Sequence, residues 1–251
     1  MFKILQKKTL VKIFNLKFKI VRLSVRVASR REAEVQNWYE VLKMAYSDFT
    51  LSKFKKSFSI RIDEETDLCA DIEPLQASEK LKNSLEETTE LALAINTEKA
   101  RSEMIITPIL LEVRRRANYP ISLFSGTDFN VDAEKGLNGY CDFIISRSKE
   151  QLTINVPVVV IIGAKNENIK GGLGQCAAAM LAAQLFNQQE GNGIRKIYGA
   201  VTTGDIWKFL KLEENDIFID LSNYYIKEID KILGILSQSV QGDIPGWSST
   251  N

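Results

Sequence analysis

The sequence predicts a mixed α/β fold, of the α+β kind, in which helices cover a largely buried sheet. Helical periodicities dominate residues 50–117, and short apolar runs typical of strands follow Pro120. Residues 158–162 are all Val or Ile, which indicates a central strand covered on both faces. The predicted order is helix, three strands, helix, strand, then extra strands and a C-terminal helix.

Each helix of the first half is predicted from its apolar spacing, and two of them from a capping residue as well. The predicted helices cover residues 50–57, 79–95 and 97–117. Ser78 and Thr97 are the expected N-caps of the second and third helices. Pro108 lacks an amide hydrogen and should kink the third helix. An acidic link at residues 63–67, closed by Pro74, separates the first helix from the second.

Strands are predicted where short runs of Val, Ile, Phe and Tyr lie between turn residues. They cover residues 121–124 together with 128–131, counted as one strand, and then 140–146, 156–165, 196–202, 207–212 and 217–220. An alanine-rich helix over residues 173–189 and a closing helix over residues 224–239 complete the prediction. Gly171, Gly172 and Gly174 lack the spacing of a phosphate-binding loop, so we interpret them as a flexible approach to the alanine-rich helix.

The absence of histidine is the most restrictive feature of the composition. Without imidazole, the chain has no Ser-His-Asp or Cys-His catalytic system and no His-ligated zinc or haem. Any catalysis must therefore use carboxylates, lysines and a bound metal. Cys69, Cys141 and Cys176 are far apart and form no CxxC pair, which favours a reducing, cytoplasmic compartment over a disulfide framework.

Charge divides the chain into a basic leader and an acidic remainder. Residues 1–43 carry 11 Lys and Arg against three Glu, which leaves a net charge of about −7 for the rest. We interpret this leader as lying upstream of a true start at Met44 and outside the fold. A nucleic-acid-binding arm and an interfacial membrane helix are the alternatives. No stretch reaches the roughly 20 apolar residues of a membrane span, and residues 241–251 are predicted to be a frayed tail.

Two polar residues lie in predicted strands where apolar side chains are expected. Asp142 lies within the strand over residues 140–146, and Lys165 ends the strand over residues 156–165. If these strands pair, both side chains meet at one end of the sheet. A carboxylate there can hold a hard cation, and an ammonium group can stabilise the charge that develops on a phosphate. A simple Asp–Lys ion pair at a strand end is the alternative.

The order and spacing of these motifs resemble the PD-(D/E)XK nuclease superfamily, in particular the N-terminal nuclease domain of type I restriction enzyme R subunits. The resemblance is carried by residues 97–103, 108–111, 139–143, 163–168 and 174–176. It implies a restriction-endonuclease-like core over residues 97–240, preceded by a helical N-terminal extension over residues 44–96. It also implies Mg²⁺-dependent hydrolysis of DNA phosphodiester bonds, with DNA and a helicase subunit or another protein as partners.

The resemblance implies roles for individual residues as well. Asp142 would be the metal-binding aspartate and Lys165 the lysine of the catalytic triad. Glu98 would be an additional acid directed at the metal, with Glu103 as a second candidate; stabilisation of the helix N-terminus by charge is the alternative. On a helical wheel Glu98 falls within the apolar stripe and is expected to point inward, whereas Glu103 lies at its edge. Gln175 matches a glutamine near the bound strand, or is simply a polar residue at a helix start.

One position departs from the family pattern. Where the triad has Glu or Asp two residues before the lysine, this chain has Gly163, and Ala179 replaces another Glu that is common in similar proteins. The loss should weaken Mg²⁺ binding, so the protein is expected to be weakly active or inactive. Glu167 is a candidate replacement if the strand continues beyond Lys165. A non-catalytic module that binds nucleic acid or protein on the same fold is the alternative, and the acidic net charge argues against broad DNA affinity.

Overall fold

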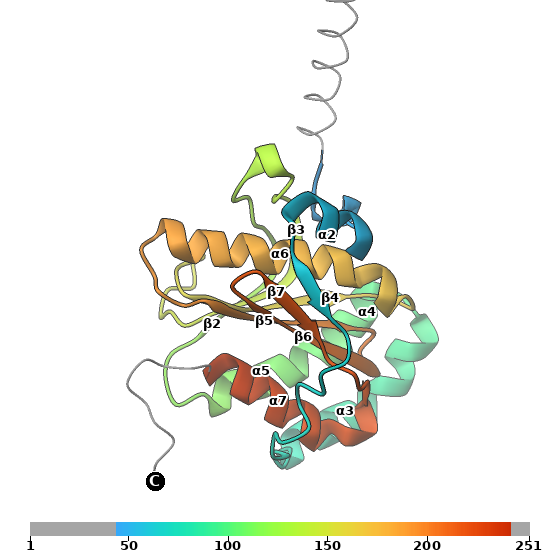
Figure 1. Ribbon diagram of the computed structural model, residues 1–251. Helices are drawn as coiled ribbons and strands as arrows, with labels where there is room; N and C mark the ends of the chain where they lie inside the picture. The colour runs from blue at the N-terminus through green and yellow to red at the C-terminus, as the bar shows by residue number, and fades with distance from the viewer. Residues whose placement is uncertain (1–43, 242–251) are drawn as a thin grey trace, which may run out of the picture. The chain divides into compact units, whose positions relative to one another are not determined.

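The computed structural model describes residues 44–241, so the predicted leader and all but the first residue of the predicted tail lie outside the described residues. An eight-stranded mixed sheet has helices on both faces (Figure 1). This confirms the mixed α/β class that the sequence predicts. Within residues 44–241, no helix is long and apolar enough to cross a membrane.

The sheet is built from both parallel and antiparallel pairs. Its strands are β1 (Arg61–Asp63), β2 (Ser122–Asp128), β3 (Tyr140–Ser146), β4 (Val158–Ala164), β5 (Lys196–Thr202), β6 (Ile206–Glu213), β7 (Asp216–Ile219) and β8 (Tyr224–Tyr225). The order is β1-β7-β6-β5-β4-β3-β2, with β8 paired to β6. β4–β5 and β1–β7 are parallel, and the other pairs are antiparallel. β1, a three-residue edge strand that ends at the first residue of the acidic link, is not predicted from the sequence.

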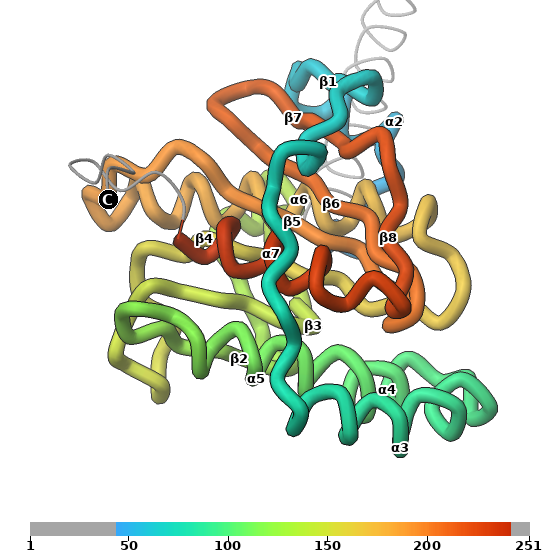
Figure 2. The backbone as a smooth tube through the Cα atoms, turned by 90° about the horizontal axis from the view of Figure 1, so that it is seen from below, coloured from blue at the N-terminus to red at the C-terminus, as the bar shows by residue number. Residues whose placement is uncertain are grey.

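The helices form two layers. They are α2 (Leu51–Phe58), α3 (Glu79–Ile95), α4 (Glu98–Arg101), α5 (Thr107–Arg116), α6 (Ile169–Gln189) and α7 (Ile229–Gln241), with a π-helical turn at Ser102–Ile106 and 3-10 turns at Tyr46–Asp48, Ala133–Lys135 and Ile226–Glu228. α2 and α6 cover one face of the sheet, and α3, α5 and α7 cover the other (Figure 1). The segment between β1 and α3 crosses α7 (Figure 2), where Leu75 N donates to Asp230 O at 2.8 Å.

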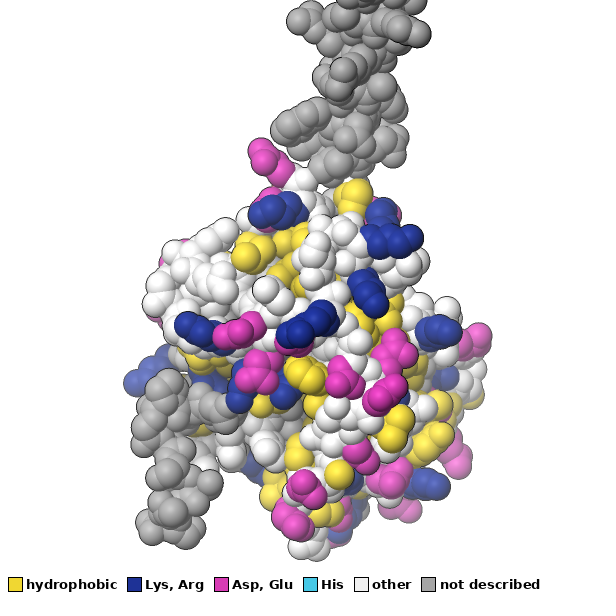
Figure 3. Space-filling view, in the orientation of Figure 1, with side chains coloured by type: hydrophobic (Ala, Val, Ile, Leu, Met, Phe, Trp, Pro, Cys, Tyr) yellow, Lys and Arg dark blue, Asp and Glu magenta, His cyan; other side chains and the backbone are white. Residues whose placement is uncertain are grey.

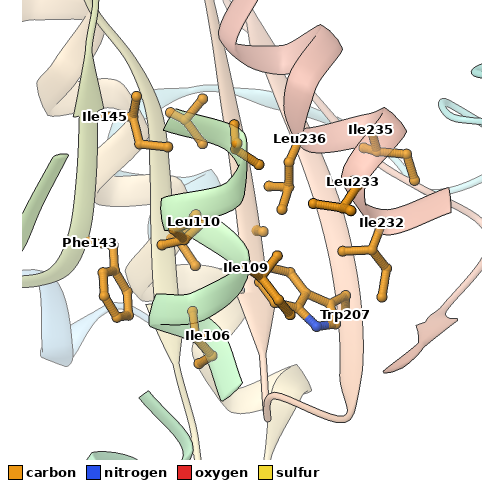
Figure 4. Close-up of a cluster of buried hydrophobic side chains, with 14 of the residues drawn as sticks. Ile106, Ile109, Leu110, Phe143, Ile145, Trp207, Ile232, Leu233, Ile235 and Leu236 are labelled. Carbon is orange, nitrogen blue, oxygen red and sulfur yellow. The ribbon is translucent and has the colours of Figure 1, made fainter. Parts of the chain in front are cut away.

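Each face of the sheet has its own hydrophobic core. Residues of β4 serve both cores, because Val160 and Ile162 pack with α5 and α7 whereas Val158 and Ile161 pack with α6. Figure 4 shows the first core, in which side chains of α5 and α7 surround the fully buried Trp207. Burial of each large apolar side chain contributes about 1.5–3 kcal/mol. Because β4 contributes residues to both cores, the prediction of a central strand covered on both faces is confirmed.

The alanine-rich helix begins four residues earlier than predicted. Asn168 caps it by accepting a hydrogen bond from Gly171 N at 2.8 Å, so the three glycines lie inside α6 and do not form a flexible approach. Gly174 is required by packing, because a Cβ there would lie 2.3 Å from the Phe49 carbonyl oxygen. Gly174 thus allows the start of α2 to approach α6 closely.

Two other boundaries differ from the prediction. β2 runs from Ser122 to Asp128, so only the first residue of the expected run 128–131 belongs to it; Gly126 lies within this strand in the left-handed conformation, with φ of 64°. The closing helix begins at Ile229, later than expected. Tyr224 instead joins β8, and its phenol donates a hydrogen bond to the buried Asp220 carboxylate at 3.0 Å.

The predicted helix over residues 97–117 contains a π-helical turn. Thr97 caps it as expected, accepting from Ala100 N at 3.1 Å. Pro108 cannot donate to the Met104 carbonyl oxygen, which instead accepts a hydrogen bond from the Thr88 hydroxyl at 2.7 Å. The irregularity therefore lies in the turn just before the proline, where backbone bonding changes from the i−4 to the i−5 pattern.

Candidate functional site

Asp142 lies on β3 directly opposite Gly163 of β4. Phe143 pairs with Ile162, and the same antiparallel register continued by one residue sets Asp142 against Gly163. Opposite residues on antiparallel strands have side chains on the same face with Cβ atoms roughly 5 Å apart. Asp142 also accepts a hydrogen bond from Ala164 N at 2.8 Å, which fixes its carboxylate at this end of β4.

The carboxylate of Asp142 is only partly exposed, and burial raises its pKa. The Ala164 amide and the positive charge of Lys165 act in the opposite direction but do not cancel the effect of burial. A carboxylate held in this way gains from any additional cation, because a second positive charge would offset its desolvation. Such an environment is typical of functional sites, although structural ion pairs produce it as well.

Lys165 follows β4 directly and is positioned by both its backbone and its stem. Its amide donates to Thr202 O at 2.8 Å, which continues the β4–β5 pairing, and its side chain is 19% exposed. The stem runs along α6, so that a Cβ on Gly172 would lie 3.2 Å from two of its carbons. Its ammonium nitrogen lies 3.9 Å from Glu98 Oε1. Lys165 is thus shared between the Asp142 carboxylate, which it influences electrostatically, and Glu98.

Gly163 faces open space. A Cβ built on this residue has no heavy atom within 4 Å, and its backbone does not adopt the left-handed conformation that favours glycine. Neither packing nor backbone geometry therefore requires glycine here. Position 163, where the family pattern has a carboxylate, therefore carries no side chain. There is room for one at this position, beside Asp142.

The three glutamates proposed as metal ligands have separate partners. Glu98 is 48% exposed and pairs with Lys165, so the expectation that it points inward is wrong. Glu103 is 61% exposed and pairs with Lys99 at 3.7 Å. Glu167 accepts a hydrogen bond from Asn96 Nδ2 at 2.8 Å. β4 ends at Ala164, so the continuing strand on which replacement by Glu167 depended is absent.

Gln175 lies in the second turn of α6 and is partly exposed. It shares a helix face with Gly172, which contacts the Lys165 stem. The next residue, Cys176, lies beneath the site: its thiol donates to Ala200 O at 3.6 Å, and burial raises its pKa to about 12. A thiol with such a pKa stays protonated near pH 7, which disfavours Cys176 as a nucleophile.

Sequence reasoning missed the buried arginine that organises the edge of this site. Arg101 donates to Thr203 O and to Asp205 Oδ1 at 2.5 and 2.7 Å, and its other terminal nitrogen donates to Asn96 Oδ1 at 3.0 Å. Asn96 ends α3 in the left-handed conformation, with φ of 53°, and in turn holds Glu167. An Asn between two helix patterns, followed by an arginine one turn into the second helix, was the available signal.

No family model, curated protein or solved structure matches the chain.

The residues present do not by themselves fit a magnesium ion. Among residues 44–241, no group of three or more Cys, His, Asp or Glu side chains is arranged to hold a metal. Mg²⁺ prefers carboxylates and water in octahedral geometry. Asp142 is the carboxylate opposite position 163, while Glu98 pairs with Lys165, Glu103 with Lys99 and Glu167 with Asn96.

Charges on the described part of the chain are mixed. Residues 44–241 carry 22 Lys and Arg and 28 Asp and Glu, a net charge of about −6. On the face drawn in Figure 3, basic and acidic side chains are interspersed and form no continuous basic surface. Contact with a nucleic acid on this face would therefore be local, because long-range attraction to phosphates needs clustered Lys and Arg.

Proposed function

We propose that this chain is a nuclease-like protein related to Mg²⁺-dependent DNA phosphodiester hydrolases of the PD-(D/E)XK type, with a restriction-endonuclease-like core. The proposal depends chiefly on one observation: Asp142, Gly163 and Lys165 lie on one face at the end of β4, in the order that the family pattern requires. The connection from β4 through α6 to the parallel strand β5 also agrees with such a core.

Without an acid at position 163, Lys165 and Asp142 could carry out only part of the catalysis. Lys165 could bind an anionic oxygen of a phosphodiester and stabilise charge that develops there. Asp142 could contribute one ligand to a hard cation, and a bound Mg²⁺ would polarise the phosphate and activate a water molecule. With no acid at position 163, the single carboxylate of Asp142 is too little to hold the ion well. The proposed protein is therefore weakly active or inactive.

Restoring the missing acid tests this proposal. Purified full-length protein should cleave duplex or single-stranded DNA little or not at all in Mg²⁺ or Mn²⁺, and Gly163→Glu should introduce cleavage. Gly163→Gln is the matched control, because it fills the same open space without a charge, and it should stay inactive. Adding Lys165→Ala to Gly163→Glu should abolish the gained activity.

Other outcomes would change the conclusion. If the unaltered protein cleaved DNA strongly and Glu167→Gln abolished this cleavage, Glu167 would supply the acid that is missing at position 163. If Gly163→Glu neither cleaves DNA nor shows a melting temperature that rises with Mn²⁺, the nuclease relationship would be contradicted.

A non-catalytic binding module on the same fold is the second candidate. Gly163 favours this alternative, because position 163 has room for an acidic side chain but carries none. Such a site suits a fold that binds nucleic acid or another protein without catalysis. Binding of DNA by the unaltered protein without cleavage, unaffected by Lys165→Ala, would support this alternative over a weakened enzyme.

A further inference from the structure

An open groove of about 440 Å³ lies between the end of α5, the start of β2 and the loop after β3. It lies away from the site at Asp142. Ser122, which begins β2, pairs with Ser146 at the far end of β3, about 14 Å of strand from Asp142. Four of the residues that line the groove carry polar groups: Arg114, Asn118, Tyr119 and Lys149.

The groove concentrates positive charge that no described acid neutralises. Three consecutive arginines end α5, but Arg115 and Arg116 both bind the buried Glu112 carboxylate. Arg114 instead donates through Nε to Ile121 O at 3.3 Å, and its four remaining N–H groups have no partner among residues 44–241. Lys149 is exposed and pairs with no acid in the described part of the chain. No Asp or Glu of the described chain lines the groove.

The wall of the groove is held in place by the end of α7. The Tyr119 hydroxyl donates to Val240 O, and Arg147 donates to the same oxygen at 2.7 Å. The Arg147 guanidinium also lies 5.7 Å from the centre of the Tyr119 ring. Tyr119 is therefore fixed in place, while the charged groups of Arg114 and Lys149 are available to a ligand.

We propose that this groove binds a phosphate group carried by a nucleotide or by a nucleic-acid chain. The free N–H groups of Arg114 form the planar fork that suits phosphate oxygens, and Lys149 supplies a second, mobile charge. Asn118 offers an amide for hydrogen bonds, and Tyr119 and Pro120 provide a wall for an attached sugar or base. The volume lies in the range of small-molecule binding sites. The proposal is independent of the function proposed for Asp142 and Lys165.

Two probes distinguish the two sources of the phosphate. Adenosine monophosphate, titrated by calorimetry, represents the free nucleotide, and a fluorescein-labelled five-residue oligothymidylate, followed by anisotropy, represents the chain. The test variant is Arg114→Gln with Lys149→Gln. The control is Arg195→Gln with Lys80→Gln, which removes one exposed arginine and one exposed lysine outside the groove. Residues 1–43 are present in every variant, so their charge affects all of them equally.

We expect the test variant to bind at least one probe about tenfold or more weakly than the unaltered protein, and the control to bind it within about twofold. The probe that responds identifies the source. Melting temperatures should not differ, since within residues 44–241 Arg114 makes one long hydrogen bond and Lys149 makes none. Equal binding by the test and control variants, or no binding of either probe at millimolar concentration, would overturn the proposal.

Discussion

Replacing Gly163 by alanine should stabilise the protein. A glycine inside a strand costs roughly 0.5–1 kcal/mol relative to alanine, mainly through the freedom of the unfolded chain. The new methyl group would meet no heavy atom within 4 Å, so no packing cost opposes this gain. For a protein of this size, the expected increase in melting temperature is about 1–4 °C. Urea titration and thermal melts of the full-length variant measure both quantities.

Gly174→Ala is the matched change with the opposite expected sign. Its Cβ would lie 2.3 Å from Phe49 O and 2.4 Å from the Thr50 carbonyl carbon, both backbone atoms that cannot rotate away. Overpacking of this kind costs about 1–3 kcal/mol. A loss of stability in Gly163→Ala comparable to that in Gly174→Ala would refute the reasoning. Packing would then require glycine at position 163, and loss of a catalytic acid would no longer be needed to explain the residue.

Two further predictions concern pH. Burial raises the pKa of Asp142, so the folded state binds this proton more tightly than the unfolded chain and loses stability as pH rises above about 4. Asp142→Asn should therefore be more stable than the unaltered protein at pH 8, a gain that shrinks toward pH 4 in thermal melts; a pH-independent difference would contradict this. Burial, the largest single influence, would raise the pKa of Glu112, but hydrogen bonds from Arg115, Ser78 and Arg116 together outweigh it and lower the pKa to about 2. Glu112→Gln should cost about 3 kcal/mol at pH 7 in urea titrations, and the deficit should narrow as pH falls from about 4.3 toward 2; an unchanged deficit at pH 3 would argue against the assigned pKa.

Local signals in the sequence predict most of the elements. Ser78 and Thr97 cap helices as expected, and the limits of β3 and β5 agree with the apolar runs that predict them. The start of α6 is mispredicted although its cap, Asn168, is local, because glycines read alone indicate flexibility. Gly174 is instead required by close packing against Phe49, more than 100 residues earlier in the chain.

The candidate site is predictable in part. The juxtaposition of Asp142 with position 163 follows from pairing two strands whose limits the sequence indicates. The orientation of Glu98 does not follow, because a wheel drawn at 3.6 residues per turn misplaces residues on the far side of a π-helical turn. Hydrogen bonds from the Arg101 side chain to Asp205 and Asn96 join three separate segments, and spacing along the chain gives no indication of them.

The position of β1 affects the order in which the sheet can be completed. Arg61 forms a bidentate ion pair with Asp216, 155 residues later in the chain, and the two strands are parallel neighbours at the sheet edge. During synthesis at about 5–20 residues per second, β1 would wait roughly 8–30 s for β7 to be made. Contacts of such separation form late, because closing a long loop costs entropy before the pairing compensates. The β1–β7 edge is therefore among the last parts of the sheet to form and, by the same reasoning, is expected to open first under mild denaturation.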